Sequence, residues 1–155
     1  MKKTILYSLL VSVIVLSTAA KIESNECDVR ILKNELLQNL KPDFKYDSSN
    51  TSRFILESKM QGTEIEIPLY STEKYRLLFN TKNLPVDVDI KIYNKRVGNK
   101  NRKLLYSSAE EKTEDKIFTY EPVNQNKIYV DYILPGIEEK DVTGCIVFLL
   151  GYKVG

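Results

Sequence analysis

The feature that most constrains this chain is an alternation of apolar and polar side chains, which begins near residue 53 and recurs through the rest of the sequence. A period of two is typical of a β-strand with one face in a core and the other in water. The pattern is clear in residues 65–69, 75–79, 86–92 and 128–134. Weaker cases are residues 54–59, 104–106 and 117–120.

Residues 145–150 are apolar on both faces, which predicts a central and deeply buried strand. Together the segments make about eight short strands, separated by turn signals, with no second helix among them. This spacing predicts a mainly β protein, an antiparallel β-sandwich of jelly-roll or Greek-key type, with a partly open barrel as the alternative. Pro68 is expected at a strand end or a sheet edge, where a missing N–H is tolerated.

One amphipathic helix is predicted before the strands, over residues 26–41. Its apolar side chains recur at spacings of three and four, at Val29, Leu32, Leu36 and Leu40. Ser24 or Asn25 is expected to cap the start of the helix, and Pro42 to end it. We expect the apolar stripe to pack on the chain's own domain and to cover an open edge or end of the sheet.

Between the helix and the first clear strand, residues 47–52 consist only of Asp, Ser, Asn and Thr. This composition predicts a turn-rich hinge. The expected organisation is therefore a leader over residues 1–20, a helix and hinge over 21–52, and a β-sandwich domain over 53–155. In this interpretation the helix packs on the sandwich, so that the two form one unit.

The first residues have the pattern of a signal peptide. Lys2 and Lys3 precede an apolar stretch over 5–16, and small residues at 17–20 offer a cleavage site after Ala20. The stretch is short for a membrane span, because a helix needs about 20 apolar residues to cross a bilayer. The alternative is an uncleaved anchor or a buried helix. We expect export to the periplasm or the cell surface, with no transmembrane span after cleavage.

Composition excludes several kinds of chemistry. The chain has no His and no Trp, and only 2 Cys. Without His there is no Ser-His-Asp or Cys-His catalysis and no His-ligated zinc, and two Cys cannot make a four-Cys zinc site. The formal net charge of +2 belongs to Lys2 and Lys3, so the rest of the chain is formally neutral. Neutrality and export argue against a nucleic-acid partner, and we expect a protein that is not an enzyme and has no cofactor.

The two cysteines, Cys27 and Cys145, are a candidate disulfide because exported chains rarely leave two thiols unpaired. The bond would close nearly the whole mature domain, which in the chain-entropy model contributes about 5 kcal/mol at most. One detail argues against it: a helical Cys27 would point away from the apolar stripe. The alternative is a pair of buried, inert thiols.

The most concentrated charge feature is a basic cluster within residues 94–103, made of Lys95, Arg96, Lys100, Arg102 and Lys103. The simplest interpretation is a polar hairpin loop between two strands. The functional interpretation is a ligand-binding basic finger that contacts an anionic envelope glycolipid or an acidic partner. The acidic residues that follow at once, within 110–115, offer neutralisation inside the same protein.

Acidic residues provide a weak candidate metal site. Asp87 and Asp89 lie on the same face of one predicted strand, and Asp131 is placed on a neighbouring strand. Clustered carboxylates are typical calcium ligands. The alternative, which we favour, is a solvated strand face on which Lys91 neutralises the pair, so no metal is predicted.

Two further strand-face features have a functional and a plain interpretation. Glu64 and Glu66 share one face, and a glycosidase needs two carboxylates about 5–10 Å apart in a cleft. Strand tyrosines offer an aromatic face for sugar or peptide recognition, or simply the margin of the core; they are Tyr93, Tyr106, Tyr120 and Tyr129.

Several segments resemble a known group of proteins. Residues 74–80, 84–90, 103–108 and 144–153, together with Cys27 and its helix, are similar to a group of small exported proteins of the Bacteroidetes lineage. The resemblance implies export and a β-sandwich, and that group has no assigned activity. A looser likeness, through Tyr75-x-Leu77-x-Phe79 followed by Asp87-Val88-Asp89, is to pre-peptidase C-terminal-type sandwich domains. It implies an accessory module of a secreted enzyme.

These observations lead to one functional expectation and two alternatives. We expect a non-enzymatic, exported binding or interaction module of the bacterial envelope, whose partner is an envelope protein or a glycan or glycolipid. The first alternative is an accessory module of a secreted hydrolase or a secretion apparatus, which makes contacts through a strand edge or a sheet face. The second is a small carboxylate-based hydrolase. A concave, aromatic-lined pocket would favour the binding module.

Overall fold

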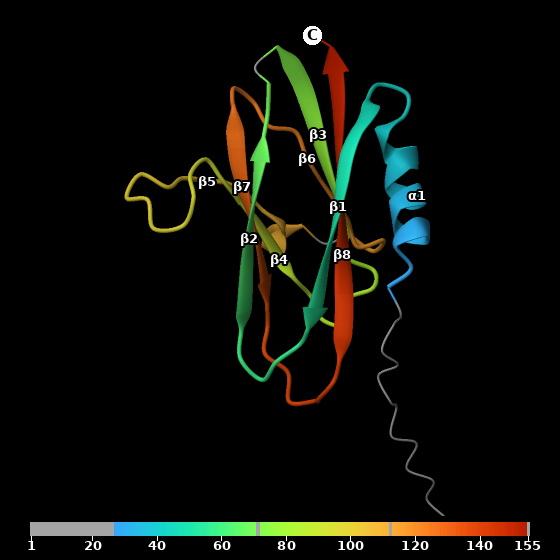
Figure 1. The fold of residues 1–155 in the computed structure, drawn as a ribbon, viewed down its shortest axis with the longest axis vertical. Helices are drawn as coiled ribbons and strands as arrows, with labels where there is room; N and C mark the ends of the chain where they lie inside the picture. The colour runs from blue at the N-terminus through green and yellow to red at the C-terminus, as the bar shows by residue number, and fades with distance from the viewer. Residues whose placement is uncertain (1–26, 71, 112, 155) are drawn as a thin grey trace, which may run out of the picture.

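The computed structural model describes residues 27–70, 72–111 and 113–154, and within them the chain forms one α-helix, one short 3-10 helix and eight strands (Figure 1). The order is α1 (Val29–Leu40), β1 (Lys45–Ile55), β2 (Gln61–Pro68), β3 (Glu73–Asn80), β4 (Asp89–Tyr93), β5 (Leu104–Ser107), η1 (Ser108–Glu110), β6 (Ile117–Tyr120), β7 (Lys127–Leu134) and β8 (Thr143–Val154). The predicted mainly β sandwich is confirmed. The predicted leader, residues 1–20, lies outside the described residues.

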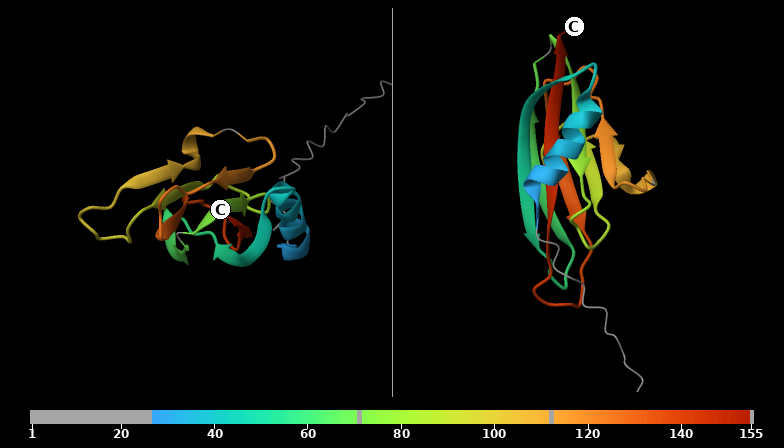
Figure 2. Two further views of the ribbon diagram at one scale, coloured as in Figure 1. Left: turned by 90° about the horizontal axis from the view of Figure 1, so that it is seen from above. Right: turned by 90° about the vertical axis from the view of Figure 1, so that its right-hand side faces the viewer.

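The strands form two antiparallel sheets that lie face to face (Figures 1 and 2). One sheet has the order β1-β8-β3-β6, and the other has the order β2-β7-β4-β5. The first strand pairs with the last, the second with the seventh, the third with the sixth and the fourth with the fifth. This is the pairing of a long antiparallel ribbon rolled into two sheets, and it makes the sandwich a jelly roll.

The main core lies between the sheets, where alternating side chains of both inner faces meet. In β7 every second residue from Ile128 to Leu134 is fully buried, as the period of two requires. Tyr132 lies at the centre, with its ring in edge-to-face contact with Phe54 and Phe79 at centroid distances of 6.2 Å. These contacts place β1, β3 and β7 around one packed interior.

Helix α1 covers the outer face of the first sheet (Figure 2). Its buried side chains, Leu32, Leu36 and Leu40, pack on a second apolar cluster that contains Leu78, Cys145, Val147 and Leu149. The expectation that α1 covers an edge or an end of the sheet is wrong. The reason is that β8 is apolar on both faces, so its outer face needs a cover as much as its inner face does. The prediction of a central, buried strand at residues 145–150 is confirmed.

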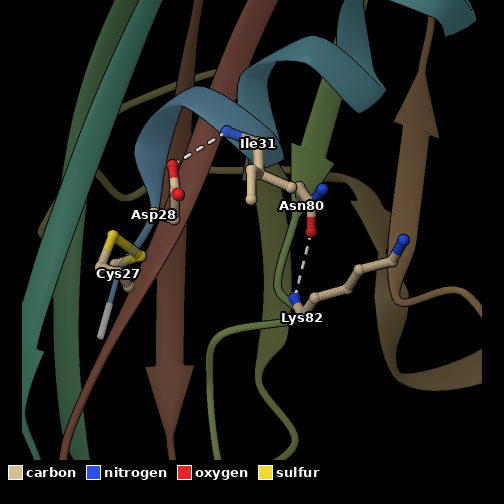
Figure 3. Close-up of a disulfide and its surroundings, with 6 residues drawn as sticks. Cys27, Asp28, Ile31, Asn80 and Lys82 are labelled. Carbon is tan, nitrogen blue, oxygen red and sulfur yellow. Dashed lines mark hydrogen bonds between the residues drawn. A yellow bond between two sulfur atoms is a disulfide. The ribbon is translucent and has the colours of Figure 1, made fainter. Parts of the chain in front are cut away.

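The start of α1 differs from the expected one. The N-cap is Asp28, whose carboxylate accepts a hydrogen bond from the Ile31 backbone N–H at 3.1 Å (Figure 3). Ser24 and Asn25 lie outside the described residues. The end of the helix is as expected, because Leu40 is its last residue and Pro42 follows two positions later.

Cys27 and Cys145 form a disulfide, with a Cα–Cα distance of 5.9 Å (Figure 3). The candidate bond is therefore confirmed. The helix-direction argument against it does not apply, because Cys27 precedes the N-cap and lies outside the helical turns. The bond ties the beginning of α1 to the central strand β8.

Three segments fold differently from their predictions. Residues 47–52 are not a hinge but the middle of β1, which is 11 residues long. The strand expected over 86–92 begins only at Asp89, and residues 54–59 contain the end of β1 followed by a connection. The first difference has the largest consequence, because it places a polar strand at the edge of a sheet, where one side of the backbone is solvated.

Candidate functional site

A groove opens between the two sheets on the side where β1 and β2 form the sheet edges. It has a volume of about 450 Å³. One wall is β1 at residues 47–50 and the other is β2 at residues 65–68, and the floor is formed by Phe148 and Leu150 of β8. Tyr70 and Tyr75 lie at the end where β2 leads into β3. We call this feature the β1–β2 groove.

The groove exists because the inward positions of β1 are too small and too polar to fill the space between the sheets. Ser48 pairs with Leu150 and Asn50 with Phe148, and cross-strand partners share a face. Leu150 and Phe148 belong to the core between the sheets, so Ser48 and Asn50 also face inward. Further along β1 the inward residue is Phe54, which is buried and closes the gap.

The opposite side of the sandwich is only partly closed, because a hollow of about 430 Å³ opens there beside η1 and β6. There β5 and β6 form the edges, and the rings of Tyr106 and Tyr120 contact each other across the gap at a centroid distance of 5.3 Å. The Tyr106 hydroxyl donates to Glu111 at 3.0 Å. These two tyrosines therefore seal the margin of the core, which was the plain interpretation of the strand tyrosines.

Tyr75 separates the groove from a second hollow at the same end of the molecule. This end pocket has a volume of about 720 Å³ and lies between the β2–β3 connection and the β6–β7 connection. Its lining is mixed, with polar groups from Glu73, Lys74 and the amide side chains of residues 124–126 and apolar surface from Leu69, Pro122 and the exposed Val123. Tyr75 itself is only 4% exposed and borders both hollows.

The Tyr75 hydroxyl is held in a negative environment. It donates to the Glu73 carboxylate at 2.7 Å and accepts from the Tyr70 backbone N–H at 3.2 Å. Burial raises the pKa of Tyr75 to about 12, and the hydrogen bond to Glu73 and the charge of Asp47 act in the same direction. Within the described residues, no Lys or Arg forms an ion pair with Asp47 or Glu73. Two carboxylates therefore lie near this hydroxyl, and neither has a cationic partner in the part of the chain that the structure describes.

The remaining acid of the groove is neutralised. Glu66 accepts from the Lys127 ammonium group in an ion pair of 2.6 Å on the solvated side of β2. The hydrogen bond from Lys127 lowers the pKa of this carboxyl. The uncompensated negative charge is thus confined to the Tyr75 end.

β1 is also a free strand edge. Its only partner among the described strands is β8, so the backbone groups on its other side face away from the sheet. Residues 46–52 contain neither Pro nor Lys, the residues that most often protect an edge, and the charged Lys45 and Arg53 flank them. β2, the facing edge, ends with Pro68, as predicted, and carries Glu64 and Glu66.

The predicted basic finger is divided by the structure. The loop over residues 94–103 extends away from the body of the sandwich (Figure 1), but Arg102 turns back onto the second sheet. Its guanidinium donates to Asp131 at 2.8 Å and to Glu64 at 2.9 Å, and it lies 3.5 Å from the centre of the Tyr93 ring. Arg102 is therefore a structural anchor and not a free binding residue.

The other members of the basic cluster differ in exposure. Arg96, Lys100 and Lys103 are exposed, and Lys95 is half-buried, with its carbonyl oxygen accepting from Arg102. The acidic residues within 110–115 follow at the far end of β5, and within the described residues no ion pair joins them to the loop. None of residues 94–103 lines the β1–β2 groove or the end pocket.

The candidate metal ligands are not brought together. Asp87 is almost fully exposed, Asp89 pairs with Lys91 at 3.2 Å, and Asp131 pairs with Arg102. Of the residues that the structure describes, no three acidic, His or Cys side chains converge on a point. The expected neutralised strand face is found only in part: Lys91 pairs with Asp89, whereas Asp87 precedes β4 and pairs with Lys116 at 3.7 Å. Glu64 and Glu66 lie on the open face of β2, and Glu64 is held by Arg102.

The groove residues were missed from the sequence. The signal lies in residues 47–52, whose polarity predicts a hinge when only the sequence is considered. A polar segment of this length between a helix and a strand array also fits an edge strand with one solvated side, and its inward Ser and Asn leave room that apolar residues would fill. The concave, tyrosine-bordered surface that would favour a binding module is thus formed by Ser48, Asn50, Tyr70 and Tyr75 with the core residues beneath them.

Comparison with known proteins adds no family. No model of a protein family matches the chain, and a search of curated proteins finds no match. In the described parts of the chain, none of the helices is long and apolar enough to cross a membrane.

Proposed function

We propose that this protein is a non-enzymatic, exported binding module of the bacterial envelope, and that the β1–β2 groove is its binding surface. The observation that carries the proposal is the groove itself, with an apolar floor, a polar wall and a free strand edge. A concave surface that combines apolar area with a few polar groups is the general form of a ligand site. The disulfide supports export, because such bonds persist in oxidising compartments.

Non-catalytic binding is supported by the carboxylates of the second sheet, which are held in ion pairs with Arg102. Glu64 and Asp131 are cross-strand neighbours on β2 and β7, and both carboxylates are held by Arg102 on an open sheet face. A hydrolase of the carboxylate type needs two such groups free in one cleft, whereas Asp47, unpaired among the described residues, lines the groove and Glu73 lines the end pocket. The groove offers contact area and hydrogen-bonding groups, which suit recognition.

An accessory role beside a larger secreted protein is the second candidate. The observation that favours it is the free edge of β1, because strand addition is a common way for one protein to hold another. Both roles use the same surface and differ only in whether the partner is a ligand or an enzyme subunit.

The test measures whether a component of the envelope slows hydrogen exchange in the groove, and whether a bulky side chain placed in the groove prevents this effect. Hydrogen exchange of the wild-type protein is followed with and without fractionated envelope extract, beside Ser48→Phe and the matched control Ser58→Phe. Both serines are exposed, but Ser58 lies in the connection between β1 and β2. We expect one fraction to slow exchange at residues 47–50 in the wild type and in Ser58→Phe, and not in Ser48→Phe. Equal exchange with and without every fraction would reject the groove as a binding surface.

A further inference from the structure

We propose that the ligand of the β1–β2 groove is an extended peptide segment of a partner protein, which adds to the free edge of β1 as a further strand. Its apolar side chains enter the groove, and a Lys or Arg side chain lies beside Asp47 at the Tyr75 end of the groove. The inference deepens the proposed function and depends on it, because it names the class of ligand for the same surface.

The backbone of β1 provides the first part of the argument. An edge strand presents N–H and C=O groups on its free side at alternate residues, and a second extended chain satisfies them. β1 is the longest edge strand of the two sheets, with 11 residues against 8 in β2 and 4 each in β5 and β6. A peptide is the ligand class that matches such a row of backbone groups, and a glycan does not have its regular spacing.

The floor of the groove is apolar and can receive side chains of an added strand. A strand added beside β1 turns every second side chain toward the space between the sheets. That space is bounded by Ile65 and Ile67 on one side and by Phe148 and Leu150 below. An apolar side chain from the peptide would complete the packing that Ser48 and Asn50 leave unfinished.

The Tyr75 end of the groove is negatively charged and favours a cationic side chain. Groove lining includes two acids, Asp47 and Glu66, and no basic residue. Lys127 neutralises Glu66, whereas no described basic residue pairs with Asp47 or with Glu73 beside Tyr75. A cationic side chain in the peptide is complementary to this end of the groove, and an anionic one is repelled.

The experiment uses two synthetic peptides of nine residues that alternate Val and Thr, one with Lys at both ends and the other with Glu at both ends. Binding to the purified protein is measured by calorimetry at low salt. We expect the Lys peptide to bind at least about tenfold more tightly than the Glu peptide. Asp47→Asn should weaken binding of the Lys peptide by about twofold to fivefold, and the control Asp87→Asn, an exposed Asp distant from the groove, should not.

A bulky side chain at position 48 tests the apolar contribution to peptide binding separately from the contribution of charge. Ser48→Phe should abolish binding of the Lys peptide, while Ser58→Phe leaves it unchanged. Urea unfolding of each variant checks that it folds. Equal binding of the two peptides, or binding that Ser48→Phe does not change, would overturn the inference.

The test also distinguishes failure of this inference from failure of the proposed function. Chitotetraose, vesicles of anionic phospholipid and self-association of the protein are measured in the same series. If Ser48→Phe abolishes one of these three interactions and the Lys peptide does not bind, the assignment of a peptide ligand is wrong. The groove is then still a binding surface. If nothing depends on Ser48, both proposals fail.

Discussion

Two tyrosine hydroxyls in this protein are expected to affect stability in opposite directions. The hydroxyl of Tyr132 is fully buried and has no hydrogen-bond partner among the described residues, whereas the hydroxyl of Tyr75 has two. An unpartnered buried polar group costs stability, and a satisfied one contributes to it. The two tyrosines therefore form a matched pair for one chemical change.

We predict that Tyr132→Phe raises the free energy of unfolding by about 1–2 kcal/mol, because it removes an unpartnered hydroxyl and keeps the ring. Tyr75→Phe should lower it by about 1 kcal/mol, because it removes two hydrogen bonds. Urea unfolding at pH 7 measures both. A loss of stability in Tyr132→Phe would mean that its hydroxyl has a partner, such as a buried water.

Arg102 and Arg96 form a second pair within one loop. Arg102 is anchored between Glu64 and Asp131, and Arg96 is exposed. We predict that Arg102→Ala lowers the free energy of unfolding by about 1–2 kcal/mol, a value kept small because the pair is partly solvated. Arg96→Ala should change it by less than about 0.5 kcal/mol. Equal effects in urea unfolding would contradict the anchoring role.

At the scale of elements, helix α1 depends on tertiary contacts. It is 12 residues long, and an isolated helix of that length is marginal in water. Its stability comes from three buried leucines on the outer face of β8 and β3 and from the disulfide at its start. Gly151 of β8 permits the close approach of Leu40, since a Cβ at that position would collide with the Leu40 side chain.

Replacing both cysteines, Cys27→Ala with Cys145→Ala, should lower the free energy of unfolding by about 2–5 kcal/mol. Urea unfolding with and without reductant provides the measurement. Reductant should shift the wild-type midpoint to the value of the double variant and leave the double variant unchanged. An unshifted wild-type midpoint would indicate that the bond does not contribute.

Leu36→Ala should lower the free energy of unfolding by about 2–5 kcal/mol, because the Leu36 side chain is fully buried between α1 and the first sheet. The neighbouring Leu37 is half-buried, so Leu37→Ala should cost clearly less. Thermal or urea unfolding compares the two. Similar losses would mean that α1 packs on the sheet through a different face.

At the scale of the whole molecule, several tyrosines couple stability to alkaline pH. Burial raises the pKa of Tyr75 to about 12 and raises the pKa values of Tyr106, Tyr120 and Tyr132 as well. The unfolded chain loses these protons near pH 10, while the folded protein keeps them. Proton loss above pH 10 therefore favours the unfolded state.

We predict that the free energy of unfolding is fully retained below about pH 10 and falls steadily above it. Urea unfolding between pH 8 and pH 11 measures the slope. Tyr132→Phe should have a shallower slope than the wild type, because one of the groups is absent. Parallel slopes would show that Tyr132 titrates normally in the folded protein.

Much of the architecture could be predicted from local patterns. Alternation in residues 128–134 and the doubly apolar run at 145–150 depend only on which side chains prefer water, and these strands lie where they were expected. The helix is similar, since the spacing of Leu32, Leu36 and Leu40 is a property of the sequence alone. The candidate site was not predictable in this way.

What the sequence by itself determined is the set of elements and which of their faces are apolar, because a strand or helix face is decided by neighbours close along the chain. What only the tertiary structure decided is where polar segments lie. Residues 47–52 became a sheet edge because β8 offers them a partner, and Arg102 became an anchor because folding brings Glu64 and Asp131 to it. The groove depends on tertiary structure in the same way: its floor on β8 is far in sequence from its walls on β1 and β2, and strand pairing brings Leu150 and Phe148 beside Ser48 and Asn50.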